Sequence, residues 1–140
     1  MEIDEEKLSN QLMEIEYIRR ELENYISGLN SLQVTQNNIA RAIDGLSVLR
    51  GNSDVLIPYA QDIFIEGKLN EVDKALINIG SNIFKMFSFK DLKEKLENDL
   101  KEVNENINTI AQTIQALQER GNKLEEEANK MYESYRNSLS

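Results

Sequence analysis

The feature that most constrains the fold is a repeat of apolar residues spaced alternately by three and four positions. The repeat runs from Leu8 to Leu46 without a break in its spacing, and only Gln11 and Gln36 interrupt its apolar character. A mean spacing of 3.5 residues, held over more than five heptads, is typical of a coiled coil because it keeps one seam facing a partner helix. The N-terminal part of the chain is therefore predicted to be one long helix.

A second repeat of the same kind occupies the C-terminal part of the chain. It runs from Leu96 to Ser138, and its exceptions are Gly121 and Ser138 itself. Two seams of similar length joined by a short segment pair most simply as an antiparallel coiled-coil hairpin, which brings both chain ends to one side. We therefore predict a single domain of three parts: a helix over 1–50, a joining module over 51–89 and a second helix over 90–140.

The joining module changes its pattern from helix to strand. Turn-forming residues gather at 51–54, 70–73 and 80–82, and Ser88 with Asp91 indicates where the helix resumes. The single proline, Pro58, predicts an edge or end position for the first strand. The predicted fold is mainly α with a small β module of two β-hairpins, whose four strands lie at about 55–59, 62–69, 75–79 and 83–87.

A small sheet of this kind needs a partner. Its two edges are open, and no helix of the chain is free to cover both edges and both faces. Assembly of several chains into a barrel-like body would remove the open edges. The alternative is a self-contained cap that merely joins the helices of a monomeric hairpin. The residues predicted to make the oligomeric contact are Val55, Ile57, Ile63, Ile65, Ile77, Ile79, Ile83, Phe84 and Met86.

The composition argues against several classes of function. Twenty-five acidic residues against sixteen basic ones give a net charge of -9, which repels nucleic acid. Histidine and cysteine are absent and no GxxxxGK motif occurs, so we expect no catalysis, no metal site and no cofactor. Because the N-terminus is acidic and no long apolar span occurs, we expect no secretory signal and no contact with a membrane. We therefore expect the protein to be cytoplasmic.

Several stretches of the chain resemble a known family. The order helix, four strands, helix comes with LIP at the first strand, IFIEGKL in the second, VDKALINIG in the third and FKDLKEKLENDLKE at the second helix. Over essentially the whole chain, this order is similar to the α-class subunit of archaeal prefoldin, whose two hairpins distinguish it from the β class. The chain departs from the family pattern at 59–62, where a glycine-rich turn is more usual, and at Ser81 and Asn82.

The resemblance implies both an assembly and a function. The assembly is a hexamer of two α-class and four β-class subunits, with a β-barrel body and six coiled-coil tentacles. The function is that of an ATP-independent holdase, a chaperone that captures unfolded client proteins and delivers them to a group II chaperonin. The implied partners are thus β-class prefoldin subunits, a further copy of this chain, clients and the chaperonin. The alternative is a structural coiled-coil spacer or a filament-forming prefoldin-like protein.

Large apolar residues outside the seams gather near both chain ends, whereas between Ile18 and Gln33 only Ile26 lies off the seam. Methionine, leucine and tyrosine suit contact with many different partners. The alternative is that Leu12, Met13 and Tyr132 only broaden the seam where the coil splays. As tentacle tips, the residues predicted to bind clients are Ile3, Leu8, Leu12, Met13, Tyr17, Met131, Tyr132, Tyr135 and Leu139.

Overall fold

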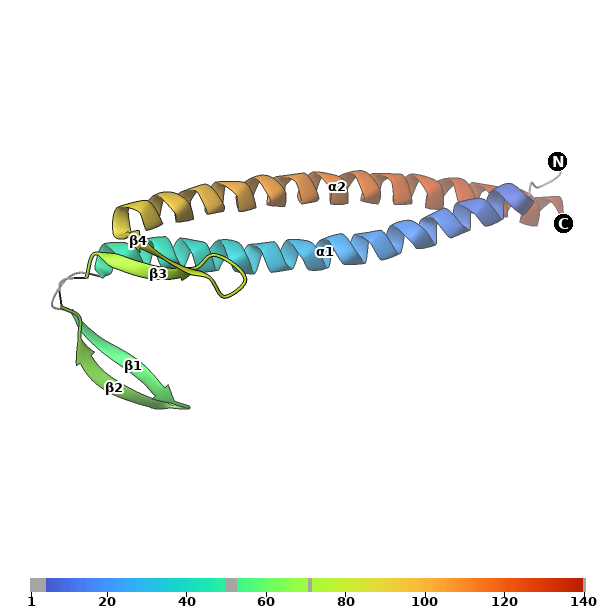
Figure 1. The fold of residues 1–140 in the computed structure, drawn as a ribbon. Coiled ribbons are helices and arrows are strands. Elements are labelled where there is room, and N and C mark those ends of the chain that lie inside the picture. The colour runs from blue at the N-terminus through green and yellow to red at the C-terminus, as the bar shows by residue number, and fades with distance from the viewer. Residues whose placement is uncertain (1–4, 50–52, 71, 140) are drawn as a thin grey trace. The chain divides into compact units, whose positions relative to one another are not determined.

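The computed structural model describes residues 5–49, 53–70 and 72–139, and it contains two long helices separated by two β-hairpins (Figure 1). The chain forms two compact units. The terminal unit combines the residues up to Val34 with those from Asn104 onward, and the central unit spans Thr35–Val103. The elements are α1 (Glu5–Val48), β1 (Asp54–Ala60), β2 (Ile63–Lys68), β3 (Lys74–Asn78), β4 (Phe84–Ser88) and α2 (Phe89–Ser138).

In the terminal unit, α1 and α2 run antiparallel and bury the predicted seam. The side chain of Gln11 contacts Glu127, while that of Glu14 contacts Arg120, so residue numbers rise along one helix as they fall along the other. Both the start of α1 and the end of α2 therefore lie at the same end of this unit (Figure 1). The buried core consists of Ile15, Ile18, Leu124 and Ala128, and Leu8, Leu22 and Leu117 pack against it.

Gly121 lies in the most closely packed part of this core. A Cβ atom at this position would stand 3.4 Å from Cγ2 of Ile18, and the Ile18 side chain is only 4% exposed. Leu124, one turn further along α2, is only 2% exposed. The glycine that interrupts the second repeat is thus the residue against which Ile18 packs.

The central unit contains the ends of the helices that flank the module. Ile43 and Leu46 of α1 line the same cavity as Phe89 and Lys93 of α2, a space of about 510 Å³. α1 ends at Val48, and the N–H of Leu49 donates to the carbonyl of Gly45 at 3.0 Å. The antiparallel helix pair predicted from the seams is therefore present in both units, each taken by itself.

The start of α2 confirms the predicted helix signal. The N–H of Asp91 donates to Oγ of Ser88 at 3.1 Å, which satisfies one of the backbone donors left free in the first turn. The carboxylate of Asp91 also lies in that first turn, where negative charge is favoured by the helix dipole. The second helix begins at Phe89, directly after β4.

The strands form two separate hairpins and not one small sheet. Within the described part of the chain, β1 pairs only with β2 and β3 only with β4, both antiparallel. The two predicted hairpins are present, but within the described part of one chain they do not join into the single small sheet of four strands that we expected, because each hairpin closes on its own turn.

The turns of both hairpins use left-handed backbone. In the first, Asp62 has a φ of 60° and β1 carries a bulge between Pro58 and Ala60. In the second, Ser81 and Asn82 have φ values of 51° and 57°, and the N–H of Ile83 donates to the carbonyl of Gly80. Two successive left-handed residues, as in the second turn, match the twist of a hairpin. With left-handed backbone in both turns, each strand pair closes locally.

Candidate functional site

The predicted tip residues lie in the terminal unit, and most of them are exposed. Met13 is 61% exposed and Leu139 is 70% exposed, although both are apolar. Leu8 and Met131 are half-buried, and Ile3 lies outside the described residues. The others, all exposed, are Leu12, Tyr17, Tyr132 and Tyr135.

Two shallow grooves lie among these residues. One, of about 190 Å³, is lined by Glu5, Leu8, Tyr132 and Tyr135. The other, of about 270 Å³, is lined by Leu12, Ile15, Arg19, Glu125, Ala128 and Asn129. Both grooves combine apolar residues with charged ones, Glu5 in the first and the Arg19–Glu125 ion pair in the second, so they offer apolar contact beside water.

A polar contact that the sequence does not reveal lies on the seam near these grooves. Gln11 is only 8% exposed, and its Nε2 donates to Oε2 of Glu127 at 3.0 Å. Its Oε1 is buried and has no hydrogen-bond partner among the described residues. A buried polar group on a seam fixes helix register at a cost in stability.

Exposed ion pairs accompany this contact. Arg120 Nη2 lies 3.2 Å from Oε1 of Glu14, and Arg19 Nη2 lies 3.7 Å from Oε1 of Glu125. Exposed pairs of this kind contribute at most about 1 kcal/mol each. They support the register more than the stability of the terminal unit.

The second candidate surface is hairpin β1–β2, which exposes apolar residues on both faces. Val55, Ile57, Ile63 and Ile65 lie on one face, and all but the half-buried Val55 are exposed. The other face carries Leu56 and Phe64, also exposed, which are not among the residues predicted to make the oligomeric contact. The sequence signal for this second face is that large apolar residues follow one another at successive positions and not only at every second one.

Hairpin β3–β4 exposes mainly one apolar face. Leu76, Phe84 and Met86 lie on it and are exposed. On the opposite face Ile77 is half-buried, whereas Ile79 and Ile83, beyond the strand ends, are exposed. Lys85 Nζ lies 5.2 Å from the centre of the Phe87 ring, a cation–π contact.

Among the described residues, no group of three or more acidic residues is placed to hold a metal ion. No described helix is long and apolar enough to cross a membrane. The exposed tip residues and the exposed faces of the two hairpins are the candidate functional sites.

The chain is similar to known prefoldin subunits. The sequence profile described as "Prefoldin subunit" matches residues 4–134. Prefoldin subunit alpha 1 of Methanocaldococcus jannaschii is 26% identical over 103 residues, which are 74% of this chain and 72% of that protein. Prefoldin subunit 5 of Homo sapiens is 28% identical over 93 residues, 64% of this chain and 56% of that protein.

A solved structure shows the same fold. The filamentous PFD from Methanocaldococcus jannaschii matches with a TM-score of 0.50 and 20% identity, covering 87% of this chain and 98% of that one. Two long helices and two small antiparallel hairpins are thus the prefoldin fold. The chain belongs to the prefoldin subunit family, and its archaeal relatives place it in the α class of these chaperone subunits.

Proposed function

We propose that the chain is an ATP-independent holdase subunit that captures unfolded proteins at the exposed ends of its terminal unit. The observation that carries this proposal is that Leu12, Met13, Tyr17 and Tyr132 are exposed in the terminal unit, where Leu12 and Tyr132 each line a groove. Apolar surface of this kind on a soluble chaperone subunit suits binding to clients that expose apolar segments.

The proposal includes the partners. The hairpins would join two α-class and four β-class subunits in a barrel-like body, and the captured clients would pass to a group II chaperonin in the cytoplasm. The exposed apolar faces of both hairpins support assembly, because an isolated two-stranded hairpin is only marginally stable in water. We further propose that the chain has no catalytic activity of its own.

The test compares two double variants of α1. Met13→Ser with Tyr17→Ser removes exposed apolar side chains near the grooves, whereas Ile26→Ser with Val34→Ser removes exposed apolar side chains elsewhere on the same helix. Aggregation of an unfolded client is followed by light scattering with each assembled variant. We expect the first variant to lose most of its protection and the second to retain it.

Circular dichroism and mass measurement show whether both variants remain helical and assembled. Equal protection by the two variants would contradict client capture at this end of the terminal unit.

A further inference from the structure

The register of hairpin β1–β2 determines which backbone groups face outward. The N–H of Leu69 donates to the carbonyl of Ser53 at 2.8 Å, so this pair is a hydrogen-bonded one. In an antiparallel ladder such pairs alternate with pairs whose backbone groups point away from the partner strand. The outward pairs are Asp54–Lys68, Leu56–Glu66 and Pro58–Phe64.

The two outer edges of this hairpin therefore differ. Pro58 has no N–H, so the edge of β1 lacks a donor, and the bulge after Pro58 distorts the same edge. The edge of β2 presents complete backbone groups at Phe64, Glu66 and Lys68. Another strand can therefore pair along β2 more fully than along β1.

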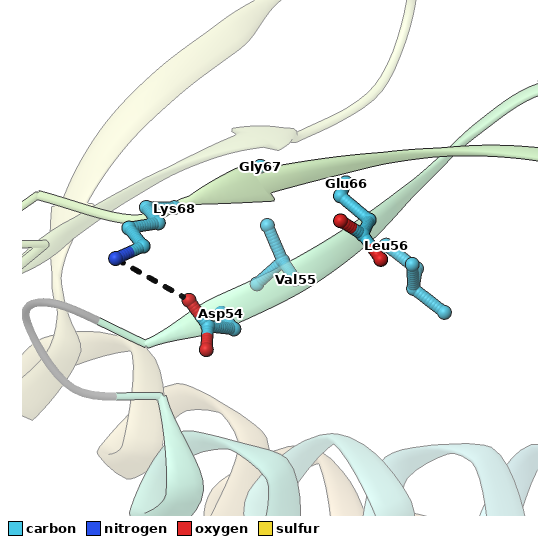
Figure 2. A pocket seen from close by; sticks show the side chains of 6 residues that line it. All are labelled: Asp54, Val55, Leu56, Glu66, Gly67 and Lys68. Carbon is cyan, nitrogen blue, oxygen red and sulfur yellow. Dashed lines mark ion pairs between the residues drawn. The ribbon is translucent and has the colours of Figure 1, made fainter.

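The side chains along β2 carry complementary charge. Glu66 and Lys68 lie on the same face, and Lys68 Nζ stands 4.0 Å from Oδ1 of Asp54 (Figure 2). Gly67 lies on the other face, where a Cβ atom would stand only 3.1 Å from Cδ1 of Ile57. The edge thus alternates one acidic and one basic residue around a glycine.

We propose that two copies of this chain pair along β2, antiparallel, with Gly67 of each copy facing the other. Glu66 of each copy then lies opposite Lys68 of the other, which gives two such pairs. Ile65 of each copy lies opposite Leu69 of the other. Opposite charges directly across a strand pair are favourable. The inference rests on the proposed assembly through the hairpins and names its edge and register.

Other registers are less favourable. Centring the pair on Glu66 places the two Glu66 carboxylates opposite each other, and like charges in this position are destabilising. Centring it on Ile65 places Glu66 opposite Phe64 and leaves no reciprocal ion pair. Charge complementarity therefore selects the register centred on Gly67.

Cysteine cross-linking of the full chain tests this register, because the chain has no cysteine of its own. Ile65→Cys and Leu69→Cys are made in separate chains. The proposed pairing sets these positions opposite each other in a non-hydrogen-bonded pair, whose short Cα separation suits a disulfide. We expect a disulfide-linked dimer from the mixture and none from either variant alone.

A dimer from Ile65→Cys alone would overturn the proposed register. If the mixture does not cross-link while light scattering still shows an oligomer, pairing along β2 is wrong and the chains assemble through other surfaces. If the chain stays monomeric at high concentration, the proposed assembly fails as well.

A charge exchange gives a second test. Glu66→Lys and Lys68→Glu should each weaken self-association about tenfold, because each places two like-charged pairs opposite each other. A mixture of the two variants restores both ion pairs and should associate like the parent chain. Lys74→Glu on β3 is the matched control and should not change self-association. If the mixture associates as weakly as the single variants, the proposal is overturned.

Discussion

The terminal unit and the hairpins of the central unit differ in how much of their apolar surface is buried. In the terminal unit Ile15, Ile18, Leu124 and Ala128 are buried within one chain, whereas no described residue of the four strands is buried. The helices thus form a core within one chain, whereas the apolar residues of the hairpins stay exposed in it. Substitutions should therefore affect folding in the first region and assembly in the second.

The largest effect is expected for Leu124→Ala. Leu124 is the most deeply buried side chain described, and its truncation leaves a cavity that should lower the free energy of unfolding by about 2–5 kcal/mol. Urea unfolding followed by circular dichroism measures this. Leu139→Ala, at an exposed position, is the control and should change little.

Leu76→Asp should break assembly without unfolding the helices. Leu76 is 60% exposed in the single chain, so only an assembled state would bury the new charge, at roughly 2 kcal/mol or more. Light scattering measures the loss of mass while circular dichroism follows the helices. Val34→Asp, at an equally exposed position on α1, is the control. An intact oligomer of Leu76→Asp would show that this face of the hairpin stays uncovered.

Gln11→Leu should stabilise the terminal unit by about 1 kcal/mol, because it removes a buried oxygen that has no partner among the described residues. Thermal unfolding measures the change. Gln11→Glu should act in the opposite direction, since it faces Glu127. A destabilised Gln11→Leu would mean that the bond to Glu127 outweighs the unpaired oxygen.

The smallest effects concern two helix glycines. Gly28→Ala should stabilise by up to about 1 kcal/mol, because nothing lies within 4 Å of its added Cβ. Gly121→Ala should gain less, since its Cβ meets Ile18 at 3.4 Å. Equal gains in urea unfolding would show that the contact with Ile18 is not restrictive.

Much of the fold follows from local patterns in the sequence. The seams, the turns and the Ser88 cap predict the helices and the strands because each depends on neighbouring residues. The contact of Gln11 with Glu127 depends on how two distant helices align, which spacing alone does not determine. Leu56 and Phe64 are missed because the prediction for the first two strands follows only every second residue, which selects one face.

The exposed hairpins also affect how the protein responds to dilution. Association stabilises whatever it covers by an amount that grows with protein concentration, whereas a core within one chain is indifferent to it. The melting of the hairpins should therefore shift with concentration and that of the terminal helices should not. In a newly made chain the helices would be stable at once, whereas the hairpins, marginal by themselves, would become stable on association with another subunit.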